Sequence, residues 1–113
     1  MEIKTEKREN SLIITISGML DASNYQVLDE AVQAEVQNGN LNFVFNLKNL
    51  EYMSSAGVRV FLKTYRAITP QRGIMAFSYL QPMVLEIFDI AGLSNKFQIY
   101  PDDEAALSAF LTS

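Results

Sequence analysis

The chain has 113 residues, of which nine are basic and thirteen acidic, and its formal net charge is −4. This length suits one domain that buries roughly 65% of its unfolded surface, and the acidic balance disfavours nucleic acid as a partner. The absence of cysteine and histidine excludes disulfides, thiol nucleophiles and histidine-based triads, and it removes most zinc and iron sites.

The N-terminal residues 1–10 are charged and contain no apolar signal core. No apolar run approaches the roughly 20 residues that a membrane-spanning helix needs. No internal repeat or linker is visible, so a second domain has no support. We therefore expect a cytoplasmic protein with a single domain over residues 1–113, no membrane span and no nucleic-acid partner.

Two strands are predicted at the N-terminal end. A short edge strand over residues 3–7 is followed by a turn at 9–10 and by a second strand over 12–18. The stretch 18–21 would then leave that strand. Alternation gives the second strand one apolar face, which consists of Leu12, Ile14 and Ile16.

A first helix is predicted to follow, ending near Gln37. Ser23 and Gln26 have the spacing of a capping box, in which each side chain satisfies a free backbone N–H at the helix start. Asn38 and Gly39 form a typical helix stop. The inner stripe of this helix consists of Tyr25, Leu28, Val32 and Val36.

A strand, a turn and a second helix are predicted over residues 41–69. The near-continuous apolar run 41–47 is typical of a strand covered on both faces. Helical spacing begins at Val58 and ends near Thr69, because Pro70 cannot continue a helix. The inner stripe would be Val58, Phe61, Leu62 and Tyr65. A solvated face would carry Arg59, Lys63 and Arg66.

The remaining sequence predicts a strand over 74–79, a helix from Pro82 to the stop at 91–92, a strand over 97–100 and a last helix. The inward residues of the two helices would be Val84, Leu85, Ile87 and Phe88, then Ala106, Leu107, Phe110 and Leu111. The order ββαβαβαβα implies an α/β domain, with a mixed sheet of about five strands and about four helices mainly on one side.

Two features at predicted helix starts are open to a structural or a functional interpretation. Ser54 and Ser55 can cap free N–H groups of the second helix, and the same groups would hold a phosphate. Asp21 lies between a strand and a helix, where an acid usually serves the turn. Gly57 precedes most of the helix, but neither nucleotide-binding glycine pattern, GxGxxG or GxxxxGK followed by Ser or Thr, occurs in the chain.

Catalysis is the weaker functional class. Asp102, Asp103 and Glu104 lie where a helix start favours negative charge, and no carboxylate pairs with an identifiable nucleophile. We therefore expect no enzymatic activity, no cofactor and no metal.

Residues 45–58, FNLKNLEYMSSAGV, resemble the signature of the STAS domains, the bacterial anti-sigma-factor antagonist family. In that family the segment ends in Asp-Ser, a small residue, Gly and an apolar residue. Most of residues 11–111 is covered by the resemblance. Three further stretches are similar to family motifs: Gly18-Met19-Leu20-Asp21, Arg72-Gly73 and Ile90-Ala91-Gly92-Leu93.

The resemblance implies a domain that binds an anti-sigma factor of the serine-kinase type and so releases a sigma factor. That kinase, which carries ATP and Mg²⁺, phosphorylates the family serine that corresponds to Ser55, and this modification switches the antagonist off. A phosphoserine phosphatase is a further implied partner. The implied docking face consists of Asp21, Ser54, Ser55, Ala56, Gly57, Val58 and Arg59.

One residue departs from the family pattern, because Ser54 stands where the family has aspartate before the phosphorylated serine. Either the kinase chemistry is altered or the chain no longer switches. Asp21, which lies beside the site in the family, is retained. Two alternatives therefore stay open, a STAS scaffold subunit of a stress-signalling or lipid-transport complex that works without phosphorylation, and a small-ligand-binding STAS domain.

Overall fold

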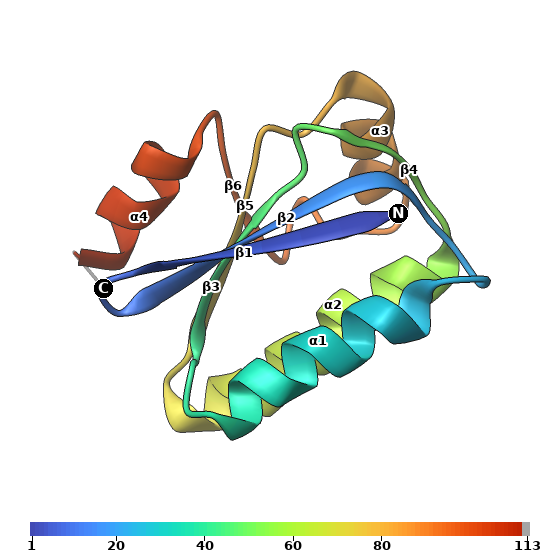
Figure 1. Ribbon diagram of the computed structural model, residues 1–113. Coiled ribbons are helices and arrows are strands. Elements are labelled where there is room, and N and C mark those ends of the chain that lie inside the picture. The colour runs from blue at the N-terminus through green and yellow to red at the C-terminus, as the bar shows by residue number, and fades with distance from the viewer. Residues whose placement is uncertain (112–113) are drawn as a thin grey trace.

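Six strands form one mixed sheet in the computed structural model, which describes residues 1–111 (Figure 1). Its order is β1-β2-β3-β5-β6, with β4 beside the end of β2. The β1–β2 pair is antiparallel, and the other pairs are parallel. The strands are β1 (Glu2–Arg8), β2 (Ser11–Leu20), β3 (Asn42–Asn46), β4 (Leu50–Met53), β5 (Ile74–Ser78) and β6 (Gln98–Tyr100).

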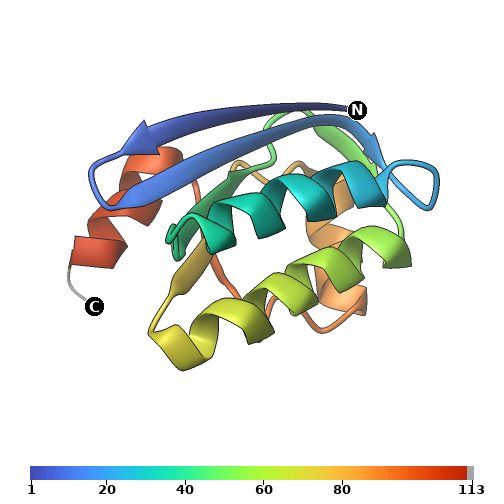
Figure 2. The same cartoon turned by 60° about the horizontal axis from the view of Figure 1, so that its bottom comes forward.

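The helices cover the sheet unequally, three on one face and one on the other. They are α1 (Tyr25–Gln37), α2 (Ser55–Ile68), α3 (Pro82–Ile90) and α4 (Asp103–Leu111), with a 3₁₀ turn at Thr69–Gln71. Helices α1, α2 and α3 share one core with the sheet, while α4 covers the opposite face (Figure 2). The predicted fold class is thus confirmed. Within residues 1–111, no helix is both long and apolar enough to cross a membrane.

The main core is built around aromatic rings. Phe77 of β5 is fully buried. Its ring centroid lies 4.9 Å from that of Phe61, 5.0 Å from Phe88, 5.2 Å from Phe97 and 5.5 Å from Phe45. Edge-to-face and offset geometries of this kind add to the stabilisation that burial of the rings provides. The cluster therefore ties the middle of the sheet to α2 and α3.

The opposite face of β3 and β5 is covered by α4, as the continuous apolar run in β3 predicts. Val44 and Ala76 point to this side and form a small core with Ile13 and Ala106. The predicted inward residues Leu107 and Phe110 are half-buried there, whereas the side chain of Leu111 lies outside the described residues.

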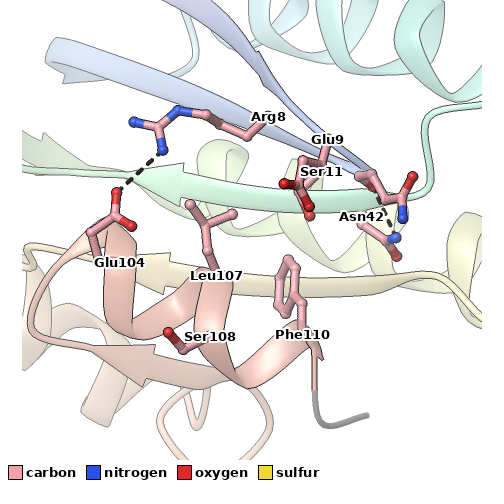
Figure 3. A pocket seen from close by; sticks show the side chains of 9 residues that line it. Arg8, Glu9, Ser11, Asn42, Glu104, Leu107, Ser108 and Phe110 are labelled. Atoms are coloured by element: carbon pink, nitrogen blue, oxygen red, sulfur yellow. Dashed lines mark hydrogen bonds and ion pairs between the residues drawn. The ribbon is translucent and has the colours of Figure 1, made fainter.

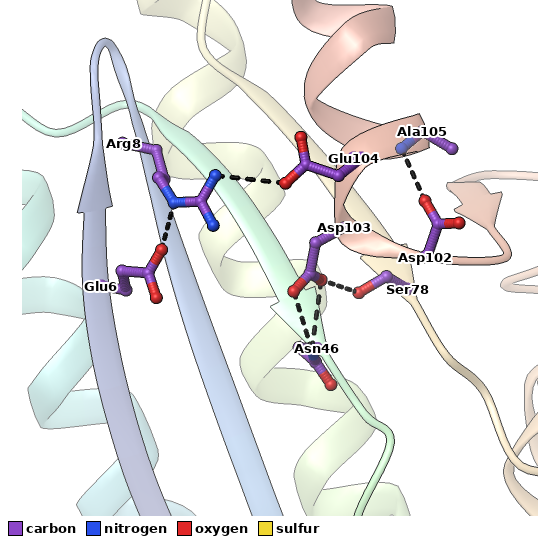
Figure 4. A network of polar contacts seen from close by, with 8 residues as sticks. All are labelled: Glu6, Arg8, Asn46, Ser78, Asp102, Asp103, Glu104 and Ala105. Carbon is purple, nitrogen blue, oxygen red and sulfur yellow. Dashed lines mark hydrogen bonds and ion pairs between the residues drawn. The ribbon is translucent and has the colours of Figure 1, made fainter.

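Polar contacts fix the start of α4 to the carboxyl ends of β3 and β5 (Figure 4). Asp103 accepts hydrogen bonds from Nδ2 of Asn46 at 3.0 Å and from Oγ of Ser78 at 2.5 Å. Both donors are buried, so the carboxylate satisfies groups that would otherwise lack partners.

On the surface, Arg8 pairs with Glu6 and Glu104, and these carboxylates raise the pKa of its guanidinium.

Strand β4 was not predicted, and it also changes the end of β2. Gly18 pairs with Leu50 and Leu20 with Met53, with a bulge after Gly18. Strand β2 therefore continues to Leu20, so the prediction that 18–21 leaves the strand was wrong. Gly18 has φ +92°, a conformation that favours glycine, and this kink redirects β2 from β3 to β4.

The predicted capping box of α1 does not form. Asn24 is the N-cap residue and makes no capping hydrogen bond with its side chain, while Oγ of Ser23 donates to Asp21. The prediction failed because the turn carboxylate competes for the serine hydroxyl. The stop at Gly39, with φ +90°, is as predicted, and Leu28 and Val32 of the predicted stripe are buried.

The inner face of α2 is rotated relative to the predicted stripe. Phe61 is buried as predicted, but Val58, Leu62 and Tyr65 are only half-buried. The buried positions also include the small or polar residues Ala56, Gly57 and Thr64, which a purely apolar pattern overlooks, together with the apolar residues Val60 and Ile68 outside the predicted stripe. In α3, Leu85 is exposed, contrary to prediction.

Candidate functional site

The candidate site lies where β2 and β4 end side by side. The backbone N–H of Ser54 donates to the carbonyl of Leu20 at 2.9 Å, which continues the parallel pairing past Met53. Asp21 directly follows Leu20, and Ser55, the first residue of α2, directly follows Ser54. The β2–β4 pairing thus places the Asp21 turn and the start of α2 at the same edge, although they are more than thirty positions apart in the sequence.

The two serines at the start of α2 have different roles. Ser54 is the N-cap, and its Oγ accepts a hydrogen bond from the N–H of Ala56 at 3.3 Å. Ser55 is the first helical residue, is exposed, and its hydroxyl makes no hydrogen bond within residues 1–111. Of the two hydroxyls, that of Ser54 caps the helix, and that of Ser55 is exposed without a hydrogen bond within residues 1–111.

Close packing under the loop depends on Gly57. A Cβ atom at this position would lie 2.7 Å from Cδ2 of Leu20 and 2.8 Å from Cγ of Met53, closer than real contacts allow. Ala56 is also buried. These two members of the predicted docking face therefore position the loop and offer a partner little surface of their own.

Asp21 is held in a tight turn before α1. Its Oδ1 accepts hydrogen bonds from the N–H of Ser23 at 2.9 Å and from the Ser23 hydroxyl at 2.6 Å. These bonds lower the pKa of Asp21, the hydroxyl more than the N–H, and the positive N-terminus of the chain adds to the effect. Asn24 closes the turn by accepting from the N–H of Asp21 and donating to the carbonyl of Met19. Asp21 is thus a fixed anion at neutral pH.

A groove of about 440 Å³ runs between α1 and α2 beside this site. Two cations on α2 line it, Arg59 and Lys63. Nζ of Lys63 lies 2.9 Å from Oδ2 of Asp29 on α1, whereas Arg59 is exposed and has no ion pair within residues 1–111. Val58, the remaining member of the predicted docking face, is half-buried.

An exposed apolar pair flanks the loop, and the sequence did not reveal it. Met19 of β2 and Tyr52 of β4 are register partners, 51% and 39% exposed. Helix α3 packs against β4 and carries Met83, which is 58% exposed. Alternation would not have placed Tyr52 on the surface, because Glu51 and Tyr52 are both exposed between the buried Leu50 and Met53.

Comparison with known proteins gives consistent results. The model of the STAS domain family matches residues 2–106. BtrV of Bordetella bronchiseptica, a candidate anti-sigma factor antagonist, is 32% identical over 113 residues, 100% of this chain and 97% of BtrV. The anti-sigma F factor antagonist of Paenibacillus polymyxa is 32% identical over 112 residues, 96% of this chain and 93% of that protein.

Solved structures agree on the fold. The anti-sigma factor antagonist SpoIIAA in its unphosphorylated form has a TM-score of 0.84 and 20% identity, covering 99% of this chain and 98% of its own. The Bacillus SpoIIAA in its phosphorylated form has a TM-score of 0.75 and 19% identity, covering 96% of this chain and 99% of its own. With the family model spanning residues 2–106, the chain belongs to the STAS domain family.

Proposed function

We propose that this chain is an anti-sigma factor antagonist, which binds an anti-sigma factor and is switched off by phosphorylation of Ser55. The names of the relatives with 32% identity support the antagonist role. The observation that carries the switch is the exposed Ser55 hydroxyl, without a hydrogen bond in residues 1–111, at a helix N-terminus that favours a phosphate.

In this function the chain is a substrate and not a catalyst. The partner kinase supplies ATP and Mg²⁺, and this chain supplies the acceptor hydroxyl and the surface that presents it. A phosphoserine phosphatase would restore the binding form. SpoIIAA, which shares the fold, exists in a phosphorylated form, so a phosphate is compatible with this architecture.

The surface around Ser55 has the composition of a binding site. Met19 and Tyr52 offer exposed apolar and aromatic area, and Asp21 and Arg59 add one anion and one cation. Interfaces typically combine a few such apolar anchors with a polar rim. We therefore extend the docking face by Met19 and Tyr52.

Incubation with the partner kinase and ATP is expected to add one phosphate, on Ser55. The kinase can be retained from native lysate on the immobilised chain and identified. Intact-mass and fragment analysis should show the phosphate in wild type and in Ser54→Ala, and none in Ser55→Ala. Phosphate on Ser54 alone would reverse the assignment. Binding without phosphate on either serine would favour the scaffold alternative.

Ser54→Asp is expected to keep the fold and raise the rate of phosphorylation. A carboxylate at this N-cap still accepts a backbone N–H, is favourable by roughly 0.3 to 1 kcal/mol near the helix start, and can orient the acceptor hydroxyl. Ser54→Asn is the matched control, because it caps without charge. The measurement is the initial rate of phosphorylation of each variant at equal kinase concentration. An unchanged rate in Ser54→Asp would mean that the kinase has adapted to serine.

One observation favours a scaffold that does not switch. Both Asp21 and Ser54 already have structural partners, in the turn and in the helix cap. A small-ligand role has less support. A hollow of about 310 Å³ lies between the β1–β2 hairpin and α4, on the face opposite α2 and thus away from the candidate site (Figure 3). There Arg8 is already paired with Glu104 at 3.2 Å.

A further inference from the structure

Arg59 lies one helical turn after Ser55 on the same face of α2. Residues at positions i and i+4 of a helix have Cβ atoms about 5–6 Å apart, within reach of an arginine side chain. Both residues are exposed, and neither side chain has a partner within residues 1–111. Lys63, another turn along, is already held by Asp29 at 2.9 Å.

We propose that phosphorylation of Ser55 captures Arg59, whose guanidinium then pairs with the phosphate and is withdrawn from the docking face. The inference rests on the proposed function, since it describes what the phosphate does once it is present. It gives Arg59 two roles, as a free cation for the partner before phosphorylation and as an internal counter-ion afterwards.

The charges around the site favour this pairing over others. The phosphate carries about −1.5 to −2 charges, and arginine binds phosphate oxygens through two parallel N–H groups. Asp21, fixed in its turn by Ser23, repels the phosphate from one side. From α1, Asp29 holds Lys63, and Tyr25 is the other polar group lining the groove. Arg59 is the groove-lining cation that remains available, and an anion four residues before a cation is the favourable order on a helix.

The consequence is a larger change of the docking face than the phosphate alone provides. Before modification, Asp21 and Arg59 present opposite charges at this end of the molecule. Afterwards the phosphate adds negative charge and Arg59 no longer reaches outward. An acidic group on the partner that bound Arg59 would lose its counter-ion and meet a phosphate.

The test installs phosphoserine at position 55 during synthesis by an expanded genetic code, so no kinase is needed. A ³¹P NMR pH titration then gives the second pKa of the phosphate in otherwise wild-type chain, in Arg59→Gln and in Arg66→Gln. Arg66 is the matched control, an exposed arginine in the last turn of the same helix. The pKa in Arg59→Gln should rise by about half a unit, roughly threefold in proton affinity. Arg66→Gln should titrate like wild type.

Equal titration of Arg59→Gln and wild type would overturn the capture, as would an equal rise in Arg66→Gln, which would indicate only long-range charge. Arg59→Lys should give an intermediate value, because lysine keeps the charge and loses the two-point contact. Failure of the proposed function looks different: the phosphoserine chain would bind the partner as tightly as the unmodified chain, whatever the titration shows.

Discussion

Phosphoserine at position 55 is expected to weaken binding of the anti-sigma factor by roughly 30-fold to several-thousand-fold, from a loss of about 2 to 5 kcal/mol. The phosphate would lie at the same edge as the fixed anion Asp21, and a partner surface shaped for a hydroxyl would bury, without partners, those phosphate oxygens that Arg59 does not pair with. The fold itself should change little, because a helix N-terminus accommodates the added charge.

Calorimetric titration of the partner with four forms measures this effect: unmodified, phosphorylated, Ser55→Ala and Ser55→Glu. Ser55→Ala should bind permanently in the presence of kinase and ATP. Ser55→Glu should weaken binding only in part, since it carries less charge and fewer oxygens than phosphoserine. Melting curves of each form are the control. A sharp fall in melting temperature on phosphorylation, with the affinity of the folded fraction intact, would contradict the interface mechanism.

Periodicity predicted most of the elements because they bury a regular face. The run in β3 alternates Phe43 and Phe45 toward the main core with Val44 toward α4, so it reads as continuously apolar. Strand β4 could not be recognised in this way, because its middle residues Glu51 and Tyr52 are exposed. Its position depends on pairing with the end of β2, a long-range contact that local pattern does not encode.

The candidate site shows the same division between local and long-range information. Capping by the serine pair at the start of α2 was foreseeable, but spacing alone could not tell which serine caps; the structure assigns the cap to Ser54. The proximity of Asp21 was implied only by family resemblance, and its physical basis is the β2–β4 pairing. For the same reason, the register pair Met19 and Tyr52 could not be placed together in advance.

Phe77→Ala is expected to lower the free energy of unfolding by about 3 to 5 kcal/mol, a large part of the roughly 5 to 15 kcal/mol typical of such domains. Phe77 is fully buried and its ring contacts those of Phe45, Phe61, Phe88 and Phe97, which come from different parts of the core. Truncation removes apolar burial and leaves a cavity that rigid strand and helix backbones cannot fill. Urea unfolding followed by circular dichroism gives the change in the free energy of unfolding, provided that the slope of this free energy against urea concentration is the same in both proteins.

Phe110→Ala is the matched control, since the same side chain is half-buried on the α4 face and lies outside the aromatic cluster. Phe110→Ala should lower the free energy of unfolding clearly less than Phe77→Ala does. Because Phe61 belongs to α2, loss of the Phe77 ring removes support beneath the helix that presents Ser55. Folded Phe77→Ala protein should nevertheless bind the anti-sigma factor with nearly unchanged affinity, since Phe77 has no exposed surface. Equal destabilisation by the two substitutions would mean that the rings around Phe77 collapse into the space it leaves, and that the cluster is not the centre of the fold's stability.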